Sequence, residues 1–340
     1  MNAARHYCPS SLTLITFLLL ASISFSVSGA NTHHPVESFE FALIGDMPYG
    51  IMTHQPHPEF TKLTAAINAH PRLQWLLHAG DIKSSREPCS DELYKIRRTQ
   101  LNQFKIPVIL TPGDNDWMDC HRRLSGGYAP LERLNALRAI FYPEPERSLG
   151  GTTMKLSSQA SQPDYAQFPE NVRWLKQNVV FATLHIVGSH NGLASFENNG
   201  RAKRGRQDDL EVEQRTAAAL AWLRDTFAIA KDKGSPGVFL MIHANPGLEP
   251  SSKNHRARAP FKTLLKALEE EIIAFARPVV LAHGDSHYFR IDKPALADAE
   301  FLTHFTRVET FGSPWLHWIR VVVTPQSPAV FTFFPEIVPD

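Results

Sequence analysis

Phe-Glu-Phe-Ala-Leu-Ile-Gly-Asp, residues 39–46, is an apolar strand-like run that ends in glycine followed by aspartate. The same ending recurs twice, because the apolar runs at residues 73–79 and 107–111 lead into Gly80-Asp81 and Gly113-Asp114. Segments with the apolar spacing of helices separate the three runs. Short apolar strands that alternate with helices predict a parallel sheet with helices packed against it.

The second half of the chain continues this alternation. Strand-like runs are followed by a lone His243 and by Gly284-Asp285-Ser286-His287, and helical spacing is found over residues 208–231 and 260–275. The β-rich tail, from residue 308 onward, predicts a hairpin or meander that closes a second sheet. Residues 148–170 are rich in Gly, Ser, Thr, Gln and Pro, which predicts a long surface loop.

Acidic and imidazole side chains therefore follow five predicted strands. The carboxyl ends of parallel strands line one crevice, where ligands bind. Carboxylates and imidazoles that converge there repel each other or stay unsatisfied unless a cation holds them. A single Gly-Asp pair is also a common turn, but five such strand ends in one chain predict a metal site. The candidate ligands are Asp46, Asp81, Asp114, His243, Asp285 and His287.

The order of these motifs resembles the calcineurin-like metallophosphoesterase superfamily, from about Phe39 to the C-terminus. That family's pattern runs Asp-x-His, Gly-Asp, Gly-Asn-His-Asp/Glu, a lone His and Gly-His-x-His. The resemblance implies an α/β fold, a four-layer α/β/β/α sandwich of two mixed sheets flanked by helices. It also implies two metal ions at the sheet edge. Asp46 and His287 would bind the first ion and Asp81 would bridge both, while Asp114 and His243 would bind the second.

Four positions depart from the family pattern. Pro48 replaces a histidine ligand, so the first metal loses a donor. Asp114 replaces an asparagine ligand, and Asp285 stands where a histidine is usual. Asn115 takes the place of a histidine that helps protonate the leaving group, and an amide cannot serve as a strong general acid.

Other side chains near these motifs have two interpretations each. Lys83 and Asn115 are candidate catalytic residues, since each could contact a phosphoryl oxygen; Lys83 is equally consistent with a surface lysine. Tyr49 could hydrogen-bond to substrate, replace the missing ligand or serve only in packing. Asp116 could orient Asn115 or a metal ligand.

Four carboxylates and two imidazoles favour hard metal ions such as Mn, Fe or Mg, and Zn stays open. Four carboxylates also cancel the charge of two divalent ions. The neutral centre predicts a relative preference for singly charged diesters over dianionic monoesters. It also predicts a labile first metal, or a trivalent iron in that position.

The expected function is an exported metal-dependent phosphoesterase that hydrolyses a phosphate mono- or diester by a metal-activated hydroxide. The alternative is a metal- or phosphate-binding protein of the same fold with little or no catalytic activity. A serine hydrolase is disfavoured, because Ser286 and His287 are adjacent in sequence and neighbours rarely have the geometry of a nucleophile and its base.

Composition bounds the partners. The 340 residues include 35 basic and 34 acidic side chains, a formal net charge of +1, so no overall field points to nucleic acid. Basic clusters at residues 201–206 and 253–258 are either solvated loops or attract an anionic substrate. We expect a small phosphorylated substrate and a monomer.

The N-terminus has the layout of a secretory signal peptide over residues 1–30. Arg5 precedes an apolar run at residues 12–23, and small residues stand at Ser28-Gly29-Ala30. A single mature domain over residues 31–340 follows, with no stable membrane anchor, and it would be periplasmic or secreted. Cys89 and Cys120 remain after cleavage, which predicts one disulfide over the alternative of two buried thiols.

Overall fold

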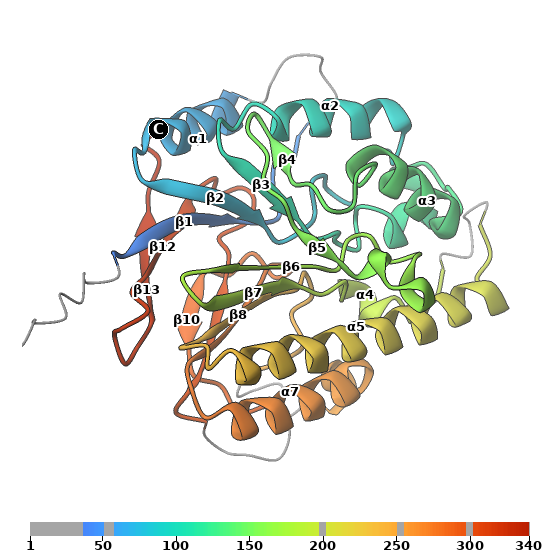
Figure 1. The fold of residues 1–340 in the computed structure, drawn as a ribbon. Coiled ribbons are helices and arrows are strands. Elements are labelled where there is room, and N and C mark those ends of the chain that lie inside the picture. The colour runs from blue at the N-terminus through green and yellow to red at the C-terminus, as the bar shows by residue number, and fades with distance from the viewer. Residues whose placement is uncertain (1–36, 51–57, 197–201, 250–254, 297–301, 340) are drawn as a thin grey trace, which may run out of the picture. The chain divides into compact units, whose positions relative to one another are not determined.

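The computed structural model describes residues 37–50, 58–196, 202–249, 255–296 and 302–339. The expected signal peptide lies outside these ranges. Two mixed β-sheets lie face to face, and helices cover the outer side of each (Figure 1). The predicted four-layer α/β/β/α sandwich is therefore confirmed.

The first sheet has the strand order β13-β12-β1-β2-β3-β4. Its central strands β1, β2 and β3 run parallel, while β12 pairs antiparallel with β1. Its strands are β1 (Phe39–Ile44), β2 (Leu73–His78), β3 (Pro107–Leu110), β4 (Leu149–Gly150), β12 (Trp318–Val323) and β13 (Phe331–Glu336). The helices on its outer side are α1 (Pro58–Ala69), α2 (Asp91–Leu101) and α3 (Pro130–Phe141).

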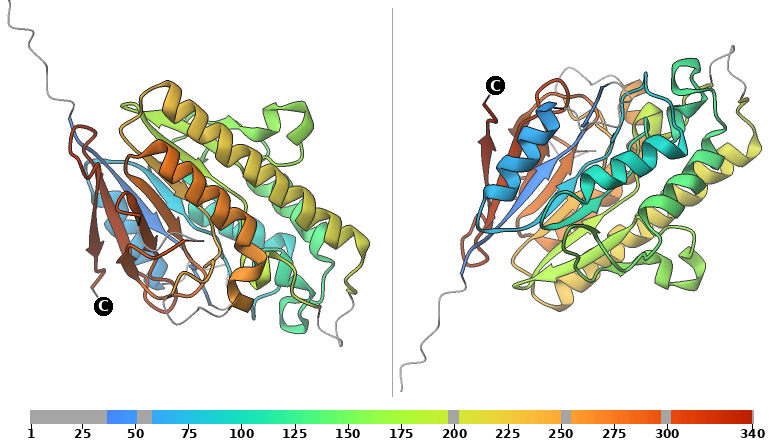
Figure 2. Two further views of the ribbon diagram at one scale, coloured as in Figure 1. Left: turned by 90° about the horizontal axis from the view of Figure 1, so that it is seen from below. Right: turned by 90° about the horizontal axis from the view of Figure 1, so that it is seen from above.

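The second sheet has the strand order β10-β11-β9-β8-β7-β6-β5. Its strands are β5 (Ser157–Ser158), β6 (Val172–Lys176), β7 (Val179–Thr183), β8 (Val238–Met241), β9 (Val279–His283), β10 (Arg290–Asp292) and β11 (Phe305–Glu309). Strands β7, β8, β9 and β11 are parallel. Helices α5 (Arg206–Asp232) and α7 (Lys262–Phe275) run side by side across the outer face (Figure 2).

Alternation along β1 explains how the layers are held together. Phe39, Phe41 and Leu43 face the second sheet, whereas Ala42 and Ile44 face the helices. Between the sheets, the Phe41 ring lies 5.1 Å from that of Phe239 on β8, edge to face. A strand that is buried on both faces is apolar at successive positions, as residues 41–44 are; Glu40 is buried too, and it pairs with Arg72.

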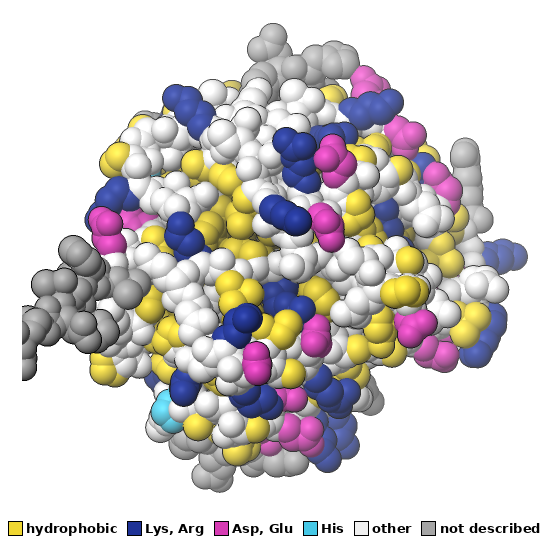
Figure 3. Space-filling model, viewed as in Figure 1, with side chains coloured by type: hydrophobic (Ala, Val, Ile, Leu, Met, Phe, Trp, Pro, Cys, Tyr) yellow, Lys and Arg dark blue, Asp and Glu magenta, His cyan; other side chains and the backbone are white. Residues whose placement is uncertain are grey.

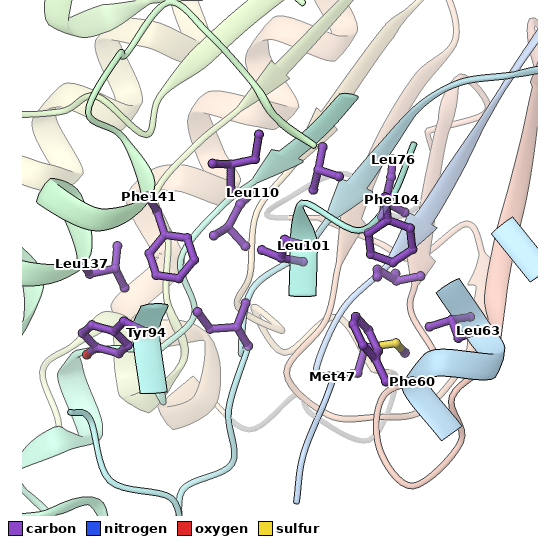
Figure 4. Packing of buried hydrophobic residues seen from close by; sticks show 14 of the residues in the cluster. Met47, Phe60, Leu63, Leu76, Tyr94, Leu101, Phe104, Leu110, Leu137 and Phe141 are labelled. Atoms are coloured by element: carbon purple, nitrogen blue, oxygen red, sulfur yellow. The ribbon is translucent and has the colours of Figure 1, made fainter. Parts of the chain in front are cut away.

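A second apolar layer lies between the first sheet and its helices (Figure 4). Leu63 and Phe60 of α1 pack beside Phe104, and Phe141 of α3 packs near Tyr94 of α2. A corresponding layer under α5 and α7 completes the core of the second sheet. These layers fix the strands whose carboxyl ends carry the candidate ligands.

Two predictions about the fold were right only in part. Residues 148–170 are more than a surface loop, because they contain β4 and β5 at sheet edges and bury Ser158, Gln159 and Glu170. The tail forms a hairpin of β12 and β13, as predicted, but this hairpin does not close the second sheet. Strand β11 joins the second sheet. Strands β12 and β13 extend the first sheet, where β12 pairs antiparallel with β1.

Short helical turns occur mainly in the loops around the strand ends. These turns are α4 (Gly188–Asn191), α6 (His255–Arg258), η1 (Met118–His121), η2 (Arg123–Ser125), η3 (Gln159–Ser161), η4 (Pro163–Tyr165) and η6 (Ala259–Phe261). No helix within the described ranges combines the length and apolarity that crossing a bilayer requires. On the face drawn in Figure 3, basic and acidic side chains of the described residues are interspersed.

The predicted disulfide is confirmed. Cys89 and Cys120 are bonded, with their Cα atoms 5.8 Å apart. The bond joins the loop after β2 to the loop after β3. Two hydrogen bonds reinforce this link: Ser125 Oγ donates to the Ser85 carbonyl at 2.8 Å, and the Cys89 amide donates to the Ser125 carbonyl at 3.0 Å.

Candidate metal centre

Both sheets contribute side chains to one edge of the sandwich. Asp46, Asp81 and Asp114 follow β1, β2 and β3 of the first sheet, while His243 follows β8 of the second. The segment after β9 supplies Asp285 and His287. Hydrogen bonds join these strand ends. The Gly284 amide donates to the His243 carbonyl within the second sheet, and His243 Nδ1 donates to the Ala79 carbonyl of the first sheet.

A first group of donors consists of Asp46, Asp81 and His243, whose ligand atoms all lie within 4.8 Å of one another. His243 Nε2 is 3.4 Å from Asp81 Oδ1. The Ala79 carbonyl, 2.7 Å from Nδ1, can only accept a hydrogen bond, so it directs Nε2 toward the carboxylates. His287 lies at the side of this group, with Nε2 3.4 Å from Asp46 Oδ1 and Nδ1 donating to the Ser313 carbonyl.

A second group consists of Asp114, Asp285 and the same His243, again within 4.8 Å. His243 Nε2 lies 3.1 Å from Asp114 Oδ1 and 4.0 Å from Asp285 Oδ1. The Asn245 amide holds the other carboxylate oxygen of Asp285 at 2.9 Å. The structure thus brings all six predicted ligands to one region, five of them in two groups that share His243.

Electrostatics at these groups fit bound cations. Burial and the neighbouring carboxylates of Asp114 and Asp46 raise the pKa of Asp81 well above its usual value. Burial and Asp114 raise the pKa of Asp285 to about 6. Carboxylates this close disfavour each other's ionised form, and divalent cations remove that penalty. Their oxygen and imidazole donors are those that Mn, Fe and Zn accept.

Backbone conformation also marks this edge. Asp46, Asp81, Asp285 and His287 have φ values of 56°, 55°, 80° and 56°, in the left-handed region that side chains other than glycine rarely adopt. Such strain persists only where the surrounding structure enforces it, and it clusters at functional sites. Close packing adds to the constraint: a Cβ on Gly284 would stand 2.2 Å from Asp46 Oδ2.

Asn115 lines the pocket, and both of its nitrogen atoms donate to Asp81. Its backbone amide donates to Asp81 Oδ1 at 3.0 Å, and its side-chain Nδ2 donates to Asp81 Oδ2. Asp116 accepts from the amides of Asp81, Ile82 and Gly113 at 2.8–2.9 Å, which agrees with a supporting role. Asp116 therefore links the backbone at Asp81 to the backbone just before Asp114.

The position of Lys83 differs from both expectations. Its side chain has no exposed surface, so Lys83 is neither a surface lysine nor placed to contact a phosphoryl group. Nζ donates to the Asn115 carbonyl at 2.6 Å. Burial lowers the pKa of Lys83, against the opposing field of Asp116 and Asp81. Lys83 therefore holds the Asn115 loop in place from the interior of the protein.

Tyr49 occupies the space beside the missing ligand at Pro48. Its hydroxyl donates to Asp81 Oδ2 at 3.0 Å and lies 3.3 Å from His287 Nε2. Orienting these two candidate ligands was not among the roles that the sequence suggested for Tyr49, and these contacts favour it. A hydrogen bond to a ligating carboxylate fixes its direction toward the metal.

Replacing Tyr49 with phenylalanine should weaken metal binding about 10-fold, the lower end of the loss typical of such supporting partners. Titration of the metal-free protein with Mn²⁺ by calorimetry measures this. Tyr288→Phe is the matched control, because Tyr288 is 65% exposed and adjoins His287 in sequence. Equal affinities for the two variants would contradict the orienting role.

An open pocket of about 400 Å³ lies over the donors. Sequence reasoning missed much of its lining: Ser84, Ser85 and Arg86 from the loop after β2, and Asp119 and Arg122 from the loop after β3. Their position in loops directly after ligand-bearing strands was the available signal. Of the two basic clusters, residues 201 and 253–254 lie outside the described residues, and the described Arg204 and Arg258 each donate to main-chain carbonyls of the fold.

A family model described as calcineurin-like phosphoesterase matches residues 39–289. The chain belongs to this family. The segment that matches the calcineurin-like phosphoesterase model contains all six candidate ligands. No curated protein matches the sequence. Membership in the calcineurin-like phosphoesterases and the two donor groups together support a metal centre and suggest hydrolase activity.

Proposed function

We propose that this protein is an exported phosphoesterase that hydrolyses phosphate mono- or diesters with two metal ions. The observation that carries the proposal is the pair of donor groups that share His243. Asp46 and His287 would hold the first ion, and Asp114 and Asp285 the second, while Asp81 and His243 lie between these pairs. When bound, the ions supply Lewis acidity toward phosphoryl oxygens and an acidified water.

The chain's own residues would orient the reaction. His243 is fixed by Ala79, and Asp81 is fixed between Tyr49 and Asn115, so the donors are preorganised before substrate arrives. Lys83 and Asp116 hold the Asn115 loop against the same carboxylate. Asn115 donates hydrogen bonds but no proton, so good leaving groups such as aryl oxides should be favoured.

Metal loading followed by a substrate panel tests the proposal. Protein stripped with a chelator and reloaded with Mn²⁺, Fe or Zn²⁺ should bind up to two ions and hydrolyse p-nitrophenyl phosphate or bis(p-nitrophenyl) phosphate. Chelation should abolish the activity and reloading should restore it. Four ligating carboxylates make the centre neutral with divalent ions, so we expect a higher kcat/KM for the diester. Activity that survives complete metal removal would refute the proposal.

A second candidate is a binding protein of the same fold with little catalysis. Pro48 and Asn115 favour it, because each replaces a histidine of the family pattern. Full metal occupancy without turnover of either ester, together with tight binding of phosphate, would support it.

Export is part of the proposal. The disulfide between Cys89 and Cys120 supports it, since such bonds persist in oxidising compartments. Recovery of the protein from the periplasm or medium, with an N-terminus near Asn31, would support export; an intact Met1 on protein from the native compartment would contradict it.

A further inference from the structure

The pocket over the donors is lined by two arginines. Arg86 lies in the loop after β2 and Arg122 follows η1 in the loop after β3. Arg86 is exposed, and no ion pair to it is found among the described residues. Arg122 is partly exposed, and its Nη1 donates to Asp119 Oδ2 at 2.8 Å. A guanidinium carries five N–H donors, so one carboxylate bond leaves Arg122 with donors to spare.

Asp119 fixes the direction of Arg122. The Asp119 carboxylate is buried, and its other oxygen accepts from Ser189 Oγ at 2.8 Å. Its backbone amide donates to the Asp114 carbonyl at 2.9 Å. Arg122 is therefore tied through Asp119 to a residue of the second donor group.

The loops that carry the two arginines are joined. The Cys89–Cys120 bond connects a residue three positions after Arg86 to one two positions before Arg122. Ser125 adds its bonds to Ser85 and Cys89. Both arginines line the pocket from loops whose backbones are linked, which reduces the entropic cost of bringing them to one anion.

The charge of the donor groups explains why the pocket needs basic side chains. Asp46, Asp81, Asp114 and Asp285 bring four negative charges to the donor groups, which two divalent ions only neutralise. A neutral centre attracts an anionic substrate weakly, so attraction must come from elsewhere in the pocket. Besides the candidate ligand His287, the basic side chains of its described lining are Arg86 and Arg122.

We propose that Arg86 and Arg122 form an anion subsite that selects phosphate esters bearing a second phosphate group. The subsite rests on the proposed phosphoesterase function and names its substrate class. One phosphate would occupy the donor groups, while the two arginines bind the other through charge-assisted, forked hydrogen bonds.

Competitive inhibition by pyrophosphate and by orthophosphate tests the subsite. In the metal-loaded wild type, measured by hydrolysis of p-nitrophenyl phosphate, pyrophosphate should inhibit at lower concentration. Arg86→Gln and Arg122→Gln should each reduce this selectivity about 10-fold, the effect of losing one hydrogen bond to a charged group. Arg122→Lys keeps a cation beside Asp119 but loses the fork, so it should be intermediate.

Arg147→Gln is the matched control. Arg147 pairs with Glu144 three residues earlier, as Arg122 pairs with Asp119, but lies outside this pocket. It should leave the selectivity unchanged. Turnover with unaltered selectivity in both pocket variants would overturn the subsite and leave the phosphoesterase function standing.

Calorimetry detects the case in which the phosphoesterase function fails and the subsite stands. Metal-loaded protein that hydrolyses neither ester, yet binds pyrophosphate through both arginines, would refute the phosphoesterase function and retain the subsite. Equal binding of pyrophosphate by wild type and both glutamine variants would refute the subsite whether or not the protein is active.

Discussion

Asp81→Asn should abolish binding of at least one metal ion and lower kcat/KM about 10³-fold, beyond the 10–100-fold loss typical of supporting partners. Asp81 lies 3.4 Å from His243 Nε2 and accepts bonds from Tyr49 and Asn115, between the two donor groups. The substitution also replaces a buried carboxylate, whose own burial raises its pKa, with a neutral amide. In metal-free protein the variant should therefore melt at the same temperature as wild type, or above it.

Melting curves with and without Mn²⁺ measure the loss of metal binding and the stability of the metal-free protein. Wild type should be stabilised strongly by the metal, since a ligand that binds only the folded state raises its stability. Asp81→Asn should show little response. Asp164→Asn, the same change at an exposed aspartate, should behave as wild type does. An unchanged metal response in Asp81→Asn would exclude Asp81 as a ligand.

Gly113→Ala should lower the free energy of unfolding by about 2–4 kcal/mol, as overpacking a close contact does, and weaken metal binding about 10²-fold. A Cβ at this position would stand 2.0 Å from Asp81 Oδ1 and 2.5 Å from the Asp81 backbone nitrogen. Rotating a side chain cannot relieve contact with the backbone nitrogen, so the strand end itself must move. That shift would displace both Asp81 and Asp114.

Gly205→Ala is the control for Gly113→Ala. A Cβ on Gly205 would meet nothing within 4 Å, and its φ of −141° suits any residue. The Asp208 side chain would still accept from the residue 205 amide at the start of α5. We expect a loss below about 1 kcal/mol in urea unfolding. Equal losses for the two variants would show that close packing at Gly113 does not hold the site.

The strand ends were predictable because the sequence marks them locally. An apolar run buried on both faces, followed by glycine and aspartate, identifies β1, β2 and β3 without knowledge of their neighbours. The partner of a strand is a long-range property, and so the placement of β12 beside β1 was missed. The edge strands β4 and β5 are two residues each, too short to show any alternation.

Side-chain direction explains the remaining differences. The sequence places Lys83 two residues after Asp81, which is compatible with a pocket residue, but the Asn115 carbonyl holds its ammonium inside the protein. Arg86 and Arg122 carry no motif, and they line one pocket because the loops that carry them lie together, joined by the disulfide. Tyr49 follows Pro48 directly, yet only the folded chain shows its hydroxyl between Asp81 and His287.

The donor groups straddle the seam between the two sheets, with Asp46, Asp81 and Asp114 on one side and His243, Asp285 and His287 on the other. A bound ion would therefore stabilise the contact between the two sheets as well as serve in catalysis. Cells starved of the metal would lose the protein itself, because a chain whose acidic seam is left uncompensated opens more often and is cleared by proteases. Its abundance would then report metal supply.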